Sequence, residues 1–181
     1  MLHRKSAHGP FSVQSASVLA LGWLAGRDLS AAEIQLRLRR AGCPDDIIHR
    51  TIEHLRFTRA IDDERVAMSR ARVEARLRGR GRSRVLLRLR SIGIDDETAR
   101  RAVDAAFEEL DQAAMLDKAL ARRLKGAESL VRTPAEYRRV YDALVRQGFA
   151  PTDVRRALDR RRASSTEFAQ NEAEPNDDGE A

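Results

Sequence analysis

The sequence has one cysteine, few aromatic residues and no long hydrophobic run. Cys43 alone cannot form an internal disulfide, which fits the reducing cytoplasm. Only 4% of the 181 residues are aromatic, and few segments alternate β-branched or aromatic residues with polar ones, so a sheet protein is not expected. The apolar run from Val18 to Ala25 is too short to span a bilayer and is interrupted by Gly22. We therefore expect a helical, cytoplasmic protein without a membrane segment.

Motifs that carry enzyme chemistry are also missing. Gly79–Ser83 has neither the lysine nor the spacing of a phosphate-binding P-loop. The chain has no His-Glu-x-x-His motif, no cysteine pair and no short-range Ser–His–Asp set. His49 and His54 are five residues apart, which places them on different faces of a helix. We expect a protein that is not an enzyme and that holds no metal and no cofactor.

Positive charge is concentrated in the first 162 residues. The net charge is +6, but no lysine or arginine follows Arg162, whereas six of the 28 acids do. Residues 1–162 therefore carry 34 basic and 22 acidic side chains, a net charge of +12. A body of this charge is expected to attract a polyanionic or acidic partner; the alternative is a merely solvated basic surface.

An internal repeat of about fifty residues is marked by Gly42, Gly93 and Gly148. Apolar residues recur eight and four residues before each glycine and one, six and ten residues after it. In that order, the five groups are Ile34, Val85 and Val140; Leu38, Leu89 and Leu144; Cys43, Ile94 and Phe149; Ile48, Ala99 and Val154; and Ile52, Val103 and Leu158. The spacing places them on one face of each helix, and the glycine, followed by an apolar residue, suits a Schellman closure between two helices.

A third helix precedes each glycine-linked pair, over about 12–26, 62–79 and 111–125. Ser30–Glu33 and Thr133–Glu136 have the pattern of capping boxes, and Asp62 and Asp63 can cap a helix. We predict an all-α fold: an elongated array of three tandem three-helix repeats, 12–57, 61–108 and 111–162. Residues 1–11 are predicted to be a flexible N-terminus, and 163–181, which lack apolar periodicity, a disordered acidic tail.

The middle repeat resembles the RecX family. The resemblance covers about residues 15–160 and is most specific in Ile61–Ala67, Arg76–Val85 and Leu89–Ile94. That family is similar in having an aspartate pair that opens a helix, a link rich in arginine and glycine, and a leucine-containing helix that closes at Gly-Ile. Val66 departs from it, since the family more often has an aromatic residue there.

The resemblance implies a monomeric regulator, not an enzyme, that lodges in the groove of the RecA filament on single-stranded DNA. It implies that ATP hydrolysis, strand exchange and stimulated repressor cleavage by RecA are limited. A different hypothesis, from charge alone, is a stand-alone basic helical module whose arginines bind nucleic acid directly. Steep salt dependence on bare DNA would favour that module, and dependence on an assembled filament would favour the regulator.

Arginines are the candidate partner-binding residues, because a guanidinium forms paired hydrogen bonds with carboxylates and phosphates. No acid occurs from Ala75 through Ile94. The first predicted group is Arg72, Arg76, Arg78, Arg80, Arg82, Arg84 and Arg88, and a secondary basic patch comprises Arg155, Arg156, Arg160 and Arg161. The alternative to binding is that these arginines form solvated basic faces. For the second group, a further alternative is that positive charge at the end of a helix is favoured by the helix dipole. The aspartate pair is expected to be a cap, and Trp23, Phe57, Phe107, Tyr137 and Tyr141 to pack in the core.

Overall fold

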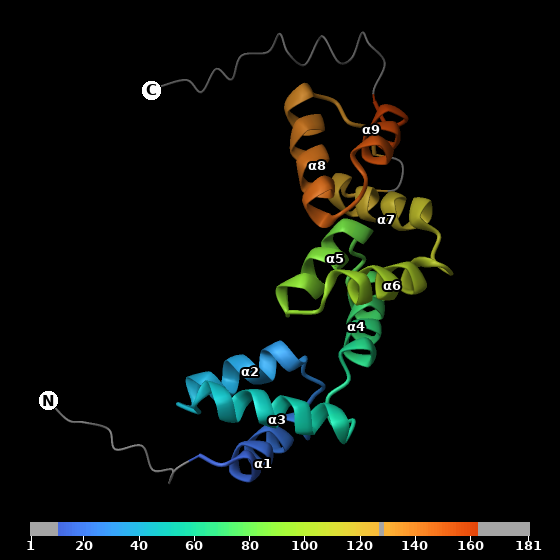
Figure 1. The fold of residues 1–181 in the computed structure, drawn as a ribbon. Coiled ribbons are helices and arrows are strands. Elements are labelled where there is room, and N and C mark those ends of the chain that lie inside the picture. The colour runs from blue at the N-terminus through green and yellow to red at the C-terminus, as the bar shows by residue number, and fades with distance from the viewer. Residues whose placement is uncertain (1–10, 127–128, 163–181) are drawn as a thin grey trace, which may run out of the picture. The chain divides into compact units, whose positions relative to one another are not determined.

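The computed structural model describes residues 11–126 and 129–162 (Figure 1). Over these ranges the chain is all-helical, with no strand and one isolated bridge between Val131 and Arg162. The α-helices are α1 Val13–Leu24, α2 Ala31–Arg40, α3 Asp45–Phe57, α4 Asp63–Arg72, α5 Arg82–Ser91, α6 Asp96–Phe107, α7 Gln112–Leu124, α8 Pro134–Gln147 and α9 Pro151–Asp159. Helix α4 continues into a π-helical turn, Val73–Leu77. In the described ranges no helix is both long and apolar enough to cross a membrane.

The helices fall into three sets of three within the predicted repeats 12–57, 61–108 and 111–162, which confirms the predicted all-α fold of three-helix sets. The chain divides into two compact units, one comprising residues up to Arg70 and Arg88–Ala102, the other Ala71–Leu87 and the residues from Val103 onward. The middle set of helices is thus shared between units, and separate repeat domains stay a prediction. The predicted flexible N-terminus, except for Phe11, and the predicted acidic tail lie outside the described residues.

All three marker glycines end a helix with the predicted closure. Gly42, Gly93 and Gly148 have φ angles of +87°, +79° and +99°, in the left-handed region that only glycine adopts without strain. The amide of the residue after each glycine donates to a leucine carbonyl at the start of the last turn. These bonds run from Cys43 to Leu38 (3.0 Å), from Ile94 to Leu89 (3.2 Å) and from Phe149 to Leu144 (3.3 Å). The three links are therefore Schellman motifs.

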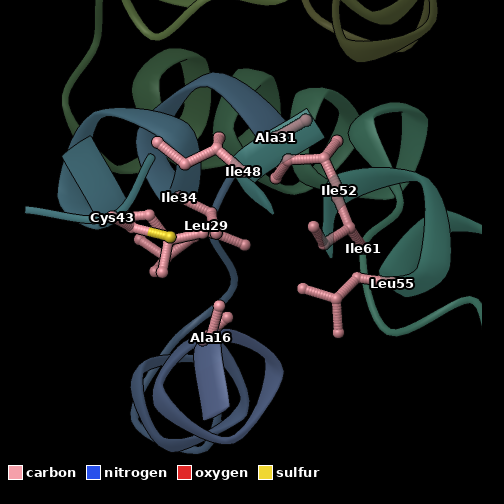
Figure 2. Packing of buried hydrophobic residues seen from close by; sticks show 11 residues of the cluster. Ala16, Leu29, Ala31, Ile34, Cys43, Ile48, Ile52, Leu55 and Ile61 are labelled. Carbon is pink, nitrogen blue, oxygen red and sulfur yellow. The ribbon is translucent and has the colours of Figure 1, made fainter. Parts of the chain in front are cut away.

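The fifteen repeated apolar positions are all buried, none more than 7% exposed. In the first unit, residues such as Ile34, Leu38, Cys43 and Ile48 pack with Ala16 of α1 in one cluster (Figure 2). In the second unit, α7, α8 and α9 pack around a matching cluster that includes Leu144. The repeat pattern therefore predicted buried positions correctly in all three sets of helices.

Aromatic residues follow the expectation with one exception. Phe107 is 3% exposed, and Trp23, Tyr137 and Tyr141 are half-buried against the two clusters. Phe57, by contrast, is 88% exposed, so its predicted place in the core is wrong. It is the last residue of α3 and follows Leu55, the last buried residue of that helix, by two positions, which places it on the opposite face.

The predicted helix starts are confirmed at Ser30 and in part at Thr133. Ser30 and Glu33 form the reciprocal capping box of α2. The Thr133 hydroxyl accepts from the Glu136 amide (3.1 Å), as expected. The Glu136 carboxylate, however, accepts from the amide of Arg132 (3.0 Å). In a reciprocal capping box the Glu136 carboxylate would accept from the amide of the cap residue Thr133. Here it accepts from the amide of the preceding residue instead.

Candidate functional site: an arginine-lined groove

Helix α5 begins against the end of α8, and this joint positions the candidate site. The amide of Gly81 donates to the Gln147 carbonyl (3.0 Å), and the amide of Ser83 donates to the Gly148 carbonyl (3.3 Å). The Gln147 side chain donates in turn to the Gly79 carbonyl (2.8 Å). A Cβ atom on Gly81 would overlap the Gly148 carbonyl. Glycine therefore allows this close approach between the link and the end of α8.

The π-helical turn after α4 holds one buried carboxylate under this link. Glu74 is 5% exposed. Its two oxygens lie 2.7 Å from the guanidinium of Arg78 and 3.2 Å from Nε of Arg80. The backbone amide of Arg80 also donates to the Glu74 carbonyl (3.0 Å). One residue on the widened turn thus orients two arginines of the link, and such π-turns are frequent at functional sites.

A groove of about 640 Å³ opens beside the joint, all within the second unit. Among the residues that the structure describes, its lining includes five arginines and no acidic residue. These arginines are Arg78, Arg80, Arg84, Arg123 and Arg146; Ser83, Leu87, Ala143, Val145, Gln147 and Gly148 complete the lining. Glu74, the carboxylate that contacts Arg78 and Arg80, does not line the groove. The groove therefore concentrates positive charge, which Glu74 offsets only at Arg78 and Arg80.

Three of the five arginines make no ion pair within residues 11–126 and 129–162. Arg123 donates a hydrogen bond to the Gln147 side-chain oxygen (3.2 Å), and Arg84 and Arg146 are exposed. The backbone of Arg84 is fixed nonetheless, because its amide donates to the Gly81 carbonyl (3.1 Å). The groove thus combines two arginines held by Glu74 with three whose charges are not neutralised by a neighbouring acid.

The other predicted arginines lie apart from this groove. Arg76 is ion-paired with Glu109 (2.9 Å). Arg82 is paired with Asp104, and its guanidinium also lies over the Phe107 ring, 5.4 Å from the centroid. Arg72 is an exposed residue at the end of α4. Arg88, in the first unit, is exposed, and its guanidinium donates to the Ser91 hydroxyl (3.5 Å).

The secondary basic patch is divided between two further cavities of the second unit. Arg156 and Arg160 line a cavity of about 510 Å³ together with Arg82, so one residue of the first group meets the second group there. Arg155 lines a separate cavity of about 520 Å³. Arg161 is half-buried, and its carbonyl accepts from the Val131 amide (2.7 Å). The residues of the predicted patch therefore line different cavities, and their role as a patch stays a prediction.

Sequence reasoning missed Arg123 and Arg146. They lie near the C-terminal ends of α7 and α8, where basic residues are favoured by the helix dipole without any binding role. The sequence offers no signal that distinguishes them: Asp142, four residues before Arg146, even has the spacing of an ordinary ion pair on a helix. The joint between residues 79–83 and 147–148 brings them to the groove, and contacts at that separation cannot be deduced from a single sequence.

The aspartate pair has two different roles. The Asp62 carboxylate accepts from the Arg65 amide (2.9 Å) and caps α4, as predicted. Asp63 does not cap α4: its carboxylate accepts from the Ala31 amide at the start of α2 (2.9 Å) and from the Arg56 guanidinium (3.0 Å). The prediction is therefore wrong for Asp63, which connects three segments of the first unit. In the described ranges, no group of three or more His, Cys, Asp or Glu is placed to hold a metal ion.

Comparisons with known proteins agree with this architecture. The family model "RecX, first three-helix domain" matches residues 16–55. The regulatory protein RecX of Syntrophotalea carbinolica is 34% identical over 134 residues, 72% of this chain and 86% of the relative. RecX of Geobacillus kaustophilus is 29% identical over 163 residues, 89% of this chain but 59% of that protein. The crystal structure of RecX from Lactobacillus salivarius has a TM-score of 0.68 at 22% identity, covering 82% of this chain and 95% of the other.

Proposed function

The chain belongs to the RecX family of regulatory proteins, and we propose that it regulates RecA by binding the RecA filament on single-stranded DNA. The arginine-lined groove of the second unit is the contact surface in this proposal. The observation that supports it is the clustering of Arg78, Arg80, Arg84, Arg123 and Arg146 around a groove to which the described part of the chain contributes no acid. The expected result of binding is inhibition of ATP hydrolysis, strand exchange and stimulated repressor cleavage by RecA. A binding role without catalysis agrees with the lack of catalytic motifs.

The groove suits an extended and regular anionic partner. Guanidinium groups form paired hydrogen bonds with carboxylates as well as with phosphates, so both a protein surface and a DNA backbone fit its chemistry. Positive charge that is not neutralised by neighbouring acids also speeds the encounter with an anionic surface. Arg84, Arg123 and Arg146 are the residues that bind the partner, whereas Arg78 and Arg80 in addition stabilise the buried Glu74.

The test is a titration of the RecA ATPase on single-stranded DNA with the wild-type chain and with the triple variant R84A/R123A/R146A. These three positions make no ion pair in the described residues, so the variant should stay folded. We expect the concentration for half-inhibition to rise at least about tenfold, which corresponds to about 1.4 kcal/mol of binding free energy. Circular dichroism should show unchanged helicity.

A matched control removes the same charge from other exposed positions. R39A/R50A/R100A also lacks three arginines, all on the first unit, where Arg39 and Arg100 are paired with Asp45 and Asp96. It should inhibit as the wild type does. Equal loss in both variants would show that total charge and not the groove governs binding. An unmodified wild-type chain that leaves the ATPase unchanged at equimolar concentration would refute the proposed function.

The second candidate function is direct nucleic-acid binding without RecA. The absence of an acid from the groove lining favours it, because a nearby carboxylate would repel a phosphate backbone. Under this alternative, binding to bare DNA should weaken steeply with salt, and each lost phosphate contact should reduce the slope of log K against log salt by about 0.9. Binding that requires assembled RecA would exclude it.

A further inference from the structure

A second basic cavity, lined by helices α8 and α9, contains two aromatic rings. Its volume is about 520 Å³, and its lining is Pro134, Tyr137, Arg138, Tyr141, Arg155 and Arg162. The Tyr137 hydroxyl donates to the Asp159 carboxylate (3.0 Å), which fixes the ring. The Arg162 guanidinium lies 6.0 Å from the centroid of the same ring. Two phenol rings and three guanidinium groups therefore face one cavity, whose lining has no acid within residues 11–126 and 129–162.

This lining is suited to a segment that carries both an aromatic ring and carboxylates. Aromatic side chains pack favourably against other rings and against guanidinium groups. Arg138 and Arg155 are exposed and make no ion pair with the residues the structure describes. Carboxylates placed at the edge of the cavity could therefore pair with both while a ring fills the space between the tyrosines.

Such a segment follows immediately in the chain. Arg162 itself lines the cavity, and residues 163–181 begin at the next position. Beyond Arg162 the sequence has no basic residue and a single aromatic one, Phe168. Its six acids are Glu167, Glu172, Glu174, Asp177, Asp178 and Glu180. The charge and the aromatic content of this segment thus complement the cavity.

The connection between Arg162 and Phe168 can reach the cavity and is short enough to favour docking within one molecule. Five residues, 163–167, separate Arg162 from Phe168, and an extended chain of that length spans roughly 17 Å. A tether this short gives an effective concentration in the millimolar range, so even weak local affinity holds the segment in place for much of the time.

We propose that the segment around Glu167 and Phe168 docks in the cavity between Tyr137 and Tyr141 of the same molecule. Phe168 packs between the two rings, and Glu167 with the following acids pairs with Arg138 and Arg155. The docked acids offset the positive charge of Arg138 and Arg155 and compete with anionic partners for these two arginines. The device is an intramolecular contact and does not depend on whether RecA is the partner.

The direct test is NMR on the full chain with labelled aromatic residues. Nuclear Overhauser effects between the ring of Phe168 and the rings of Tyr137 or Tyr141 are expected, unchanged on dilution. Their absence would overturn the proposal. Contacts seen only between differently labelled molecules in a mixed sample would also overturn it, because the occupant would then be a second copy of the chain.

A binding assay separates docking from a general effect of charge. The affinity for a fluorescent oligothymidylate should rise about three- to tenfold in Phe168→Ala, which releases the segment without a change in charge. The matched control Gln170→Ala, also in the segment and neutral, should bind as the wild type does. If replacing the six acids by their amides raises the affinity while Phe168→Ala has no effect, the segment acts by charge alone and the docked arrangement is wrong.

Discussion

The carboxylate of Glu74 and the guanidinium of Arg78 form a 2.7 Å ion pair in which the acid is almost completely buried and the base is largely exposed. The same carboxylate contacts Arg80 from its other oxygen. This arrangement sets the geometry of the link between α4 and α5, because one residue inside the π-helical turn holds two arginines at the groove. Glu74 is thus a positioning residue for the candidate site.

Glu74→Gln should reduce the free energy of unfolding by about 1–2 kcal/mol. The substitution keeps the size of the side chain but replaces charge-assisted hydrogen bonds to two guanidinium groups by weaker ones in a buried position. Urea denaturation followed by circular dichroism measures the change. Asp104→Asn is the control, because that carboxylate pairs with Arg82 but is 68% exposed, and it should change stability by less than about 1 kcal/mol. Equal effects would mean that burial of Glu74 does not matter.

The cores of the helix sets could be predicted from the sequence because the signals are local. Helical spacing alone places Ile34 and Leu38 on one face, and a glycine followed by an apolar residue specifies the Schellman closure that Gly42 and Cys43 form. Since the same pattern occurs three times, each copy supports the others. The resemblance of residues 60–94 to the RecX family then identified the arginine-rich link.

The groove could be predicted only in part, because contacts between distant segments create it. Arg78, Arg80 and Arg84 belong to one basic run of the sequence, whereas Arg146 reaches the groove through the joint of residues 79–83 with 147–148. The same limit explains Asp63, whose partner Ala31 lies 32 residues earlier. The sequence around Asp63 has the pattern of a helix cap, and that pattern is the same whether the carboxylate caps its own helix or contacts a distant amide.

Gly148→Ala should be far more destabilising than Gly42→Ala, although both glycines have positive φ angles. A Cβ atom at position 42 meets nothing within 4 Å, so that variant should lose only the backbone term of about 1–2 kcal/mol. A Cβ atom at position 148 would lie 2.5 Å from the Arg84 amide nitrogen, which should add about 1–3 kcal/mol of overpacking. Thermal or urea unfolding of the two variants compares them. Similar losses would show that the joint between α5 and α8 can relax.

Asp63→Ala should cost more stability than Asp62→Ala. Asp62 is a helix cap, whose removal typically costs about 1 kcal/mol, whereas Asp63 satisfies the Ala31 amide and pairs with Arg56. Losing both interactions should cost about 2–3 kcal/mol. A double-mutant cycle with Arg56→Ala separates the ion pair from the amide contact, and most of the loss should remain in the Arg56→Ala background. A larger effect of Asp62→Ala would contradict the assignment of the two roles.

Tyr137 should make stability depend on alkaline pH. Burial raises its pKa above the ordinary value of 10.0, as do the hydrogen bond to Asp159 and the charge of that acid, while Arg155 and Arg162 oppose the shift. Because the folded chain holds the proton more tightly than the unfolded chain, the resulting stability is fully present below pH 10 and is lost as pH rises through the folded pKa. Absorbance at ~295 nm in a Tyr141→Phe background follows Tyr137 alone, since the chain has two tyrosines. Asp159→Asn should lower this pKa and Arg155→Ala should raise it further; the reverse order would show that the hydroxyl and the Asp159 carboxylate are not in contact.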